Sequence, residues 1–539
     1  MKTLPQTTDI VILGGGLAGL TLALQLRSEV PGARVTVLER LEHPVPEAAH
    51  KVGESTVEIG AHYFANVIGL REHLERDQLR KYGLRFFFDA GENADLAGAT
   101  ELGASHLLTV PSYQVDRGIL ENHLAERVLA EGMVLIGGAR VVDVELGEGD
   151  EGHRVHFRYG GERHELTARW VVDAMSRTSV IRRRKELDES NGHGCSAVWF
   201  RIDDRIDLGR WSADAGWRKR CSQLPRWLST NHLMGAGYWV WLIPLSSGST
   251  SVGIVFDNDL HDFDSLRTWE GTLEWLARHQ PRCRRAIDES TGELLDFRRL
   301  RNFSHGCRQV YSRHRWALTG EAGVFLDPFY SPGSDFIAIS NTFVSDLIRR
   351  DMDGEAIARR TRLYERNYLS FYESSLALYR GQYPLFGHAR AMSAKTIWDY
   401  AYYWAVLALI FFAGRTNDVQ FLARHGEMLE HLRRLNLEMQ NLFLTWSRVE
   451  SPEGIEGVFI NQSEIDVLVR LNRELVELDG PPALDERMKR NGEMLCELAG
   501  ALRTVAPGRA ASEVSLHREP GDPAAILAGL PAEMIRPSS

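Results

Sequence analysis

Cysteine is scarce in this sequence. The 539-residue chain has five cysteines, and no two of them have the two-residue spacing of a zinc or redox motif. This scarcity excludes a disulfide framework and predicts reduced thiols, no bound metal and a cytoplasmic protein. Residues 1–9 lack a basic stretch followed by an apolar run, so we expect no secretory signal. The cysteines are Cys195, Cys221, Cys283, Cys307 and Cys496.

Long apolar runs and an excess of positive charge are also missing. The longest apolar run, at 400–414, has about fifteen residues, whereas a membrane-spanning helix needs about twenty. We therefore expect no transmembrane segment and interpret the run as a buried or docking helix. The chain has 63 basic and 73 acidic residues, and this net charge of −10 argues against a nucleic-acid partner.

The bulk composition is that of an ordinary folded protein. Apolar residues make up 44% of the chain and charged residues 25%, which is enough for a buried core and argues against wholesale disorder. At roughly 150 residues per domain, the length predicts two to four domains.

The clearest signal lies in the first forty residues. Apolar runs at 9–13 and 34–38 predict two strands, and residues 20–27 predict a helix between them. In the intervening turn, Gly14 permits a tight bend, Gly16 lets the backbone approach a pyrophosphate, and Gly19 lets the helix lie close to the strand. Glu39 ends the second strand and can accept hydrogen bonds from a ribose. This unit predicts dinucleotide binding by Gly14, Gly16, Leu17, Ala18, Gly19, Glu39 and Arg40.

The order of the later elements favours FAD over NAD. A helix is predicted to open within QVDR at 114–117 and to run to residue 130. Strands are predicted at 134–136, 140–145 and 170–174, and a last strand at 316–323 runs into a turn of small residues. This order resembles the FAD-binding fold of flavoprotein monooxygenases. The resemblance implies that Arg117 and Val142 contact the cofactor, and that Glu321 replaces the family's aspartate on the ribityl chain. Only one glycine fingerprint is visible, so we expect a separate NAD(P)H flavin reductase.

The fold class that we predict is α/β. It has an FAD-binding, Rossmann-type domain like that of flavoprotein monooxygenases, an inserted β-sheet substrate domain and a helical C-terminal region. The expected boundaries are 1–189 and 305–350 for the FAD-binding domain, 190–304 for the sheet, 351–505 for the helices and 506–539 for a flexible tail. Apolar residues at three- and four-residue steps over 429–442 predict an amphipathic helix.

Four short segments point to a narrower family. They are GYWVWLIP at 237–244, which contains Trp239 and Trp241, Lys81 within LRKYG at 79–83, DPFYSPGSD at 327–335, and HKVGES at 50–55. Together they resemble the flavin-dependent halogenases, which share a WxWxIP signature and have a catalytic lysine in a similar setting. The resemblance spans residues 9–350.

The resemblance implies a reaction. Reduced FAD and O2 form a C4a-hydroperoxide, and chloride or bromide attacks it to give hypohalous acid. The acid travels through a tunnel to Lys81, which either donates a hydrogen bond to it or forms a haloamine with it, and an electron-rich aromatic substrate then takes the halogen. A lysine suits this role because its ammonium is a compact donor whose pKa shifts readily on burial. Trp239 and Trp241 would keep the flavin peroxide from reacting directly with the substrate.

The same resemblance assigns the remaining site residues. Ser331, Gly333 and Ser334 would bind the halide, with the Gly333 and Ser334 amides as donors because Pro332 has no N–H. Glu54 would act beside the flavin ring. The other flavin contacts that we expect are Lys51, Val52, Gly53, Asp327, Pro332 and Gly333.

One departure from the tryptophan halogenases narrows the substrate. Those enzymes have a glutamate before the Ser-x-Gly loop, whereas this chain has Tyr330. A phenol or pyrrole activates itself more easily than free tryptophan does, and some relatives of that kind act on substrates tethered to a carrier protein. We therefore expect such a substrate, in secondary-metabolite or antibiotic biosynthesis. The aromatic segment 398–412 either covers that site or is plain core, and an exposed patch there would support a homodimer.

Simpler interpretations stay open for each motif. Lys81 also fits a solvated helix face, the two tryptophans fit ordinary core packing, and the segment at 331–333 fits a plain turn before a helix. Glu54 also fits a structural role. For the whole chain, the alternatives are an FAD-dependent monooxygenase on the same fold and a non-catalytic flavin-binding scaffold subunit.

Overall fold

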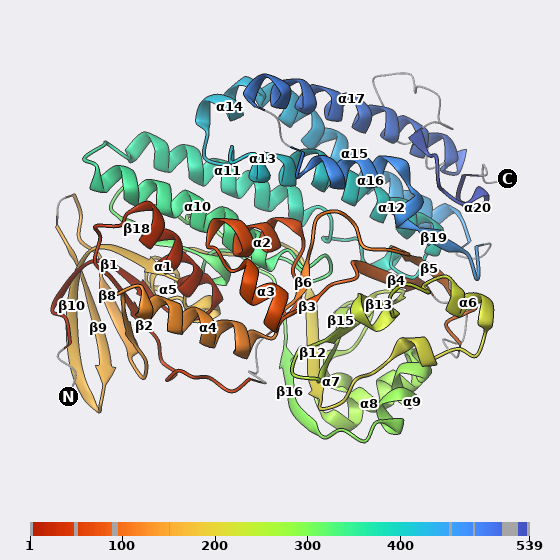
Figure 1. Cartoon of the computed structure of the whole chain (residues 1–539), viewed down its shortest axis with the longest axis horizontal. Helices are drawn as coiled ribbons and strands as arrows, with labels where there is room; N and C mark the ends of the chain where they lie inside the picture. The colour runs from red at the N-terminus through yellow and green to blue at the C-terminus, as the bar shows by residue number, and fades with distance from the viewer. Residues whose placement is uncertain are drawn as a thin grey trace. The chain divides into compact units, whose positions relative to one another are not determined.

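The computed structural model of the chain describes residues 4–47, 52–88, 95–149, 151–451, 455–477, 480–508 and 526–535 (Figure 1). The chain divides into two units. Unit 1 comprises Met1–Gln78, Val115–Gly192 and Ser304–Glu373. Unit 2 comprises Leu79–Gln114, His193–Phe303 and Ser374–Ser539.

This division differs from the expected one in two places. Leu79–Gln114 belongs to unit 2 instead of the FAD-binding domain, because strand β4 (Leu84–Phe88) pairs with β13 (Thr230–Gly235). The sheet and the C-terminal helices also share one unit. Here β5 (Thr100–Gly103) pairs with β19 (Phe459–Asn461). Both differences come from strand pairing across large separations in sequence, which a local pattern does not encode.

Unit 1 is built on a seven-stranded sheet in the order β7-β2-β1-β10-β9-β8, with β18 paired to β10. The pairs β7–β2, β2–β1, β1–β10 and β10–β18 are parallel, and β9 pairs antiparallel with β8 and β10. The strands are β1 (Thr7–Leu13), β2 (Val35–Leu38), β7 (Val134–Ile136), β8 (Arg140–Glu145), β9 (His153–Tyr159), β10 (Glu162–Asp173) and β18 (Trp316–Leu318).

The helices of unit 1 cover the parallel strands. Helices α1 and α4 pack side by side, and α10 packs against α1 and α2 (Figure 1). A two-stranded ladder joins β11 (Asp188–Glu189) to β17 (Gly306–Cys307). The helices are α1 (Leu17–Glu29), α2 (Glu58–His62), the π-helix η1 (Tyr63–Val67), α3 (Arg71–Asp77), α4 (Arg117–Ala130), η2 (Ser176–Thr178), α5 (Val180–Arg184), η5 (Gly320–Ala322), α10 (Gly333–Met352) and α11 (Ala358–Leu376), whose last turn lies in unit 2.

The register of the parallel strands places their carboxyl ends at one edge of the sheet. Leu13, the last residue of β1, is level with Leu38 of β2 and with Asp173 of β10. The segments that follow these three residues therefore emerge at one edge of the sheet, where α/β folds bind ligands. This edge carries the glycine turn and Glu39.

Unit 2 contains an eight-stranded sheet in the order β16-β12-β15-β14-β13-β4-β5-β19. The pairs β13–β4 and β5–β19 are parallel and the others antiparallel. A separate ladder pairs β3 (Leu79–Arg80) with β6 (Tyr113–Gln114). The strands not yet given are β12 (Cys195–Ile202), β14 (Tyr238–Pro244), β15 (Thr250–Asp257) and β16 (Leu294–Leu300).

Two helical groups accompany this sheet. Helices α7–α9 pack on one sheet face, where their apolar side chains join one core cluster with Val240, Val252 and Ile254. The C-terminal helices form a second group in which α15 packs against α12 and α17. The helices are η3 (Leu208–Arg210), α6 (Ala215–Lys219), η4 (Arg226–Leu228), α7 (Phe263–Leu266), α8 (Trp269–His279), α9 (Pro281–Glu289), η6 (Tyr383–Leu385), α12 (Ala389–Tyr402), η7 (Tyr403–Ala408), α13 (Leu409–Phe412), α14 (Val419–Arg424), α15 (Gly426–Val449), η8 (Gln462–Glu464), α16 (Asp466–Glu474), α17 (Pro481–Val505) and α20 (Ala532–Ile535).

Most of the aromatic segment at 398–412 is buried within α12, η7 and α13, and Tyr403 and Leu407 are partly exposed. Among the described helices, none is both long and apolar enough to cross a membrane. The chain end differs from the expected loose tail over residues 526–535. There Leu527 and Met534 are buried, because two apolar side chains are enough to hold a short segment against the unit.

One buried histidine makes the stability of unit 1 pH-dependent. His153 is fully buried at the start of β9, where Nδ1 accepts from the Gly147 N–H (3.1 Å) and Nε2 lies 3.0 Å from the Arg315 carbonyl oxygen. Burial lowers the pKa of His153 from 6.5 to about 4. The unfolded chain therefore binds one more proton than the folded chain between these two pH values.

We expect the free energy of unfolding to fall as the pH drops from 6.5 to 4, by up to about 3 kcal/mol from this residue. His153→Gln should make that part of the profile less steep. Part of the slope should remain, because burial also lowers the pKa values of His62 and His73 of the same unit to about 4. Thermal unfolding midpoints of both proteins between pH 4 and 8 measure the effect. Equal acid sensitivity in the two proteins would contradict the role assigned to His153.

Candidate active site

The glycine turn after β1 has the close contacts that its sequence predicted. Gly14 has φ +103°, and a Cβ there would lie 2.7 Å from the Ala174 carbonyl oxygen. A Cβ on Gly19 would lie 2.0 Å from the Gly14 carbonyl oxygen, because α1 starts against the end of β1. At Gly16, by contrast, no described atom lies within 4 Å of an added Cβ. The backbone is therefore packed at Gly14 and Gly19 and open at Gly16.

The open side of this turn fits the pyrophosphate of a dinucleotide. Gly16 is the N-cap of α1 and gives its helix no side-chain cap, and Leu17 and Ala18 begin the first turn. Amides of a helix N-terminus attract anions, and here they lie beside the space at Gly16. The Glu39 carboxylate accepts from the Gly15 N–H (2.6 Å), which holds it next to the turn. Arg40 is exposed.

The segment at 52–54 is held by hydrogen bonds to residues at the start of α4. Arg117 donates through Nη1 to the Val52 carbonyl oxygen (2.6 Å) and through Nη2 to Glu121 (2.5 Å). Gly53 has φ +92°, and an added Cβ would lie 3.0 Å from Arg117 Nη1. Glu54 is 2% exposed, and its carbonyl oxygen accepts from the Val115 N–H (2.7 Å). Arg117 thus holds the backbone at Val52, next to Gly53. Lys51, which was also expected to contact the flavin, lies outside the described residues.

The turn after β18 approaches the start of α1. Gly320 has φ +59°, and an added Cβ would lie 3.0 Å from the Ala18 Cβ. The neighbouring Glu321 accepts a hydrogen bond from Ser176 Oγ (2.7 Å). The carboxylate that replaces the expected aspartate is therefore oriented by a hydroxyl on η2, beside the same helix start that carries the glycine turn.

Asn341 of α10 ties these pieces together, and sequence reasoning missed it. Its Nδ2 lies within hydrogen-bond distance of the Ala18 carbonyl oxygen (3.2 Å), Thr21 Oγ1 (3.1 Å) and Tyr63 Oη (3.1 Å). Its Oδ1 accepts from Thr319 Oγ1 (2.6 Å). Its neighbours in the chain are Ser340 and Thr342, so no local pattern marked it, and its role follows from its burial and its four partners.

Asp173, at the end of β10, is a second missed residue. It is fully buried and accepts from the Met175 N–H (3.0 Å), the Ile181 N–H (3.0 Å) and Ser179 Oγ (2.8 Å). Burial raises the pKa of this carboxyl group, and the three donors act against that rise. Asp173 thereby shapes the turn that places Ser176 beside Glu321.

The loop at 327–335 runs into α10. Asp327 is buried and accepts from the Phe329 N–H (2.9 Å), and Ser331 has φ +57°, which is uncommon for a residue with a side chain. Pro332 is the N-cap of α10, so the Gly333 and Ser334 amides belong to its first turn. Asp335 turns its carboxylate to the Gly60 N–H (2.8 Å).

This helix start has the donors that a halide requires. The Ser334 hydroxyl is buried and has no hydrogen-bond partner among the described residues. The nearest carboxylate in sequence, that of Asp335, is engaged by Gly60. A monovalent anion would therefore meet N–H and O–H donors here.

Val142 is not brought to this edge. It lies in β8, which β9 and β10 separate from β1, at an irregularity in the β8–β9 register, and it is 47% exposed. The structure thus gives Val142 no contact with the glycine turn or Glu39 through the sheet. The other predicted flavin residues of the described chain lie on segments that follow β1, β2 or β18, or on the segments tied to α4 and α10.

Lys81, in unit 2, is 3% exposed. Helix α3 ends at Asp77, and Lys81 follows the short strand β3, so the solvated helix face considered for it is not what the chain forms. Its N–H donates to the Ser112 carbonyl oxygen (2.8 Å). A lysine that is almost fully buried outside any helix requires a reason other than solubility.

Trp239 and Trp241 lie in the eight-stranded sheet of unit 2, which also contains β4, a strand that begins shortly after Lys81 in the chain. Trp239 and Trp241 occupy alternate positions of β14, so they share a face, and their rings are 5.7 Å apart. Trp239 Nε1 donates to Tyr383 Oη (3.0 Å) and Trp241 Nε1 to Ser251 Oγ (3.2 Å). A Cβ on Gly253 would lie 2.2 Å from the Trp241 ring, so only glycine leaves room for it.

An aromatic row extends from this pair to β4, the strand that begins three residues after Lys81. His232 lies opposite Trp241 and has its ring 5.1 Å from that of Trp239, and it stacks on Phe86 at 4.6 Å. The core cluster under α7–α9 takes the alternate residues of β14, such as Val240. The tryptophans therefore do not belong to that core and line the opposite sheet face.

A separate cavity of about 590 Å³ lies between α15 and α17. None of the predicted site residues lines it. Its wall includes Leu432 and Leu435 from the predicted amphipathic helix, together with His431 and Cys496, whose Nε2 and Sγ atoms are 3.6 Å apart.

Comparison with known proteins agrees with this geometry. Residues 7–225 match the FAD binding domain family. The chain is therefore an FAD-binding flavoprotein with the α/β fold that its sequence predicted.

Its relatives are more specific. The chain is 26% identical over 431 residues to the flavin-dependent halogenase chlA of Dictyostelium discoideum, covering 74% of this chain and 70% of that protein. It is 27% identical over 347 residues to a 1H-pyrrole-2-carbonyl-(peptidyl-carrier protein) chlorinase of Pseudomonas fluorescens, covering 60% and 72%. It is thus a homologue of the flavin-dependent halogenases, and the resemblance inferred from its four motifs is confirmed.

A solved structure shares the fold over nearly the whole chain. The halogenase PltM in complex with phloroglucinol and FAD aligns with a TM-score of 0.65 at 16% identity, covering 94% of this chain and 97% of that one. The halogenase CmlS aligns with a TM-score of 0.55 at 18% identity, covering 95% and 74%. At these identities the likeness concerns the fold.

Proposed function

We propose that this chain is an FAD-dependent halogenase that chlorinates or brominates an electron-rich aromatic substrate. The observation that carries the proposal is Lys81, an almost fully buried lysine beside a strand whose sheet bears the Trp239–Trp241 pair. The proposed reaction also requires bound FAD, which we place at the edge of the unit 1 sheet that carries the glycine turn. A separate NAD(P)H-dependent reductase would provide the reduced flavin, in a cytoplasmic setting.

The bound cofactor would supply two electrons for the activation of O2, which allows a halide to be oxidised. The residues of this chain then have distinct tasks. The glycine turn and the start of α1 hold the pyrophosphate, Glu39 holds a ribose, and Glu321 faces the ribityl chain. Gly333 and Ser334 hold chloride or bromide through their amides.

Lys81 would donate a hydrogen bond to the oxidised halogen and direct it to the substrate. Burial keeps competing water away from its ammonium group. The tryptophan pair would separate the substrate from the oxidising centre. Because Tyr330 stands where a carboxylate would assist an indole, the favoured substrate is a phenol or pyrrole that needs no such help. The named relative from Pseudomonas fluorescens supports a pyrrole on a carrier protein as one form of it.

A product screen by mass spectrometry tests the proposal. The protein is supplied with FAD, a flavin reductase, NADH, O2 and chloride or bromide, together with phenols, pyrroles and indoles, both free and carrier-bound. We expect a product with the isotope pattern of the supplied halogen. Oxygenated or desaturated products without halogen, under both salts, would contradict the proposal and identify a monooxygenase or dehydrogenase.

A further inference from the structure

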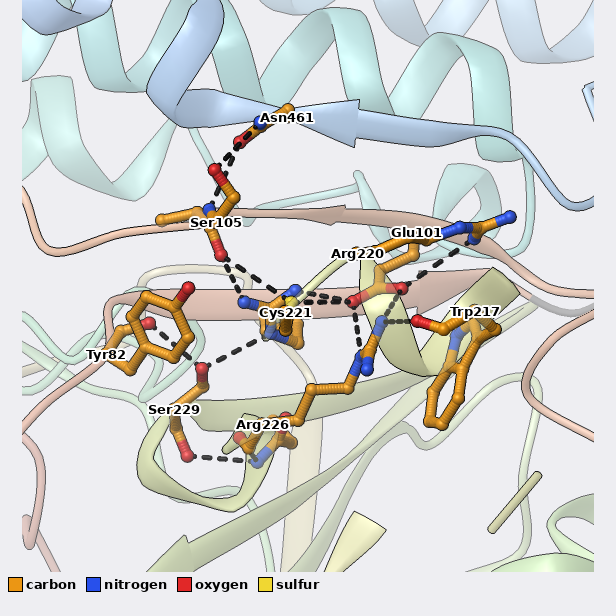
Figure 2. A network of polar contacts seen from close by, with 12 residues as sticks. Tyr82, Glu101, Ser105, Trp217, Arg220, Cys221, Arg226, Ser229 and Asn461 are labelled. Atoms are coloured by element: carbon orange, nitrogen blue, oxygen red, sulfur yellow. Dashed lines mark hydrogen bonds and ion pairs between the residues drawn. The ribbon is translucent and has the colours of Figure 1, made fainter. Parts of the chain in front are cut away.

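A buried cluster of charges lies directly after Lys81 in the chain. Arg85 and Arg226 both pair with Glu101, and all three side chains are at most 2% exposed (Figure 2). Arg85 Nη1 reaches Glu101 Oε1 at 2.5 Å, and Arg226 reaches the two Glu101 oxygens at 2.8 and 3.0 Å. Arg85 also donates to the Ala104 carbonyl oxygen. We call Arg85, Glu101, Arg226 and Ser229 the Glu101 network.

Ser229 connects this network to the residue that follows Lys81. Its Oγ accepts from Arg85 Nε (3.3 Å). It also donates to the Tyr82 carbonyl oxygen (2.9 Å; Figure 2). The Arg85 guanidinium lies 5.2 Å from the centre of the Tyr82 ring. Charge, hydroxyl and ring contacts thus all converge on Tyr82.

The backbone on both sides of Lys81 is held as a result. The Lys81 N–H donates to the Ser112 carbonyl oxygen (2.8 Å), and the Tyr82 N–H donates to that of Leu228 (3.0 Å). The Tyr82 carbonyl is the one bound by Ser229. The first two bonds hold the peptide units on either side of the Lys81 Cα, and the third holds the next unit, between Tyr82 and Gly83. Together they restrain the direction in which the Lys81 side chain leaves the backbone.

Among the side chains that Figure 2 labels, that of Glu101 is the only carboxylate. Burial raises the pKa of Tyr82 to about 12 and also raises that of the Cys221 thiol, so both stay protonated. Two buried guanidinium groups therefore share one carboxylate with the partly exposed Arg220, whose Nη1 lies 3.8 Å from Glu101 Oε2, and the cluster keeps a positive charge. Such an arrangement gives little net stability compared with apolar packing, and its best-attested use is to specify one arrangement of neighbouring groups.

We propose that the Glu101 network positions Lys81, with Ser229 as its link to the backbone of the next residue, Tyr82. This role rests on the proposed function, in which the lysine directs the halogen. Ser229, Arg85, Glu101 and Arg226 are positioning residues here and take no part in the reaction themselves. A displacement of about 1 Å at a reacting group can cost two orders of magnitude in rate, so a rigid backbone at Lys81 has a large effect.

Two variants test the link and the charge separately. Ser229→Ala removes one buried hydroxyl and leaves every charge in place, whereas Glu101→Gln keeps the shape and removes the anion. The first readout is amide hydrogen exchange of the peptide at 79–84, which needs neither substrate nor flavin. We expect exchange at Lys81 and Tyr82 to be about tenfold faster in both variants than in the wild type.

The second readout is the number of halogenated product molecules formed per O2 consumed. The ratio is measured in a single turnover of protein-bound reduced FAD after free flavin has been removed, because free reduced flavin also consumes O2. Under these conditions only folded protein is counted, so a loss of folded protein alone leaves the ratio unchanged. We expect it to fall at least about tenfold in both variants, because reduced flavin still consumes O2 while the halogen is directed poorly.

Asp399→Asn is the matched control. Asp399 pairs with Lys395 at 2.7 Å, both side chains are at most 3% exposed, and the pair lies in the same unit but on helix α12. This variant should lose stability as the other two do. It should leave both the exchange at 79–84 and the product ratio at their wild-type values.

Unchanged exchange at 79–84 in both variants would overturn the proposal, as would faster exchange with an unchanged product ratio. A wild-type protein that brominates and chlorinates nothing would defeat the proposed function instead. In that case the hydrogen exchange still decides whether the network holds the Lys81 backbone.

Discussion

Replacing Lys81 by alanine should lower the rate of halogenation by about 10²–10⁴-fold, while reduced flavin continues to be oxidised by O2. The residues that we propose to bind the flavin lie in unit 1 and Lys81 lies in unit 2, so the variant removes the group proposed to direct the halogen and leaves the proposed flavin site unchanged. Halogenated product measured by mass spectrometry and O2 uptake measured with an electrode give the two rates.

The control is a solvent-exposed lysine. Lys185 is exposed after α5, and Lys185→Ala should change neither rate. Lys81→Arg keeps the charge but removes the primary amine, so it separates hydrogen bonding from transfer through a haloamine. Retention of halogenation in Lys81→Ala would show that the oxidised halogen reaches the substrate without the lysine.

Replacing Gly16 by valine should weaken FAD binding by at least about 100-fold and leave the apoprotein folded. The side chain would enter the space at the start of α1 where no described atom lies within 4 Å, which is where the pyrophosphate fits. Gly16 has φ −87°, a conformation open to any residue, so the cost to folding is that of a poorer N-cap, about 1 kcal/mol. The lost contacts with a charged phosphate are worth about 1.5–3 kcal/mol each.

Fluorescence titration with FAD and thermal unfolding of the apoprotein measure the two effects. Gly32→Ala serves as the control, because an added Cβ there also meets no described atom within 4 Å but lies beyond the end of α1, away from the cap. FAD affinity equal to that of the wild type in Gly16→Val would show that the phosphates bind elsewhere.

The FAD-binding unit could be predicted from sequence because its signals are local. A strand, three glycines and a helix follow one another within about twenty residues, and the steric need for glycine at Gly14 and Gly19 arises within that same turn. Glu39 follows from the end of the next strand. Each of these features depends on neighbours in the chain and on the ordinary geometry of a parallel sheet.

The motifs at 79–83 and 237–244 could also be recognised in the sequence, but the burial and packing of their side chains could not be predicted from it. Local charge suggested a solvated helix at Lys81, whereas burial and the pairing of β3 with β6 exclude it. The alternation of β14 predicted that Trp239 and Trp241 share a face. It did not show that the core of unit 2 lies on the other one.

The sequence by itself determined the class of fold, the FAD-binding unit and the resemblance to the flavin-dependent halogenases, since these depend on short-range patterns. Only the tertiary structure decided that Leu79–Gln114 belongs to unit 2 and that Glu101 joins Arg85 and Arg226 behind Tyr82. Arg226 stands 125 residues from Glu101 in the chain. Their charges meet because β4 pairs with both β5 and β13, and strand pairing over such separations depends on the packing of the whole sheet.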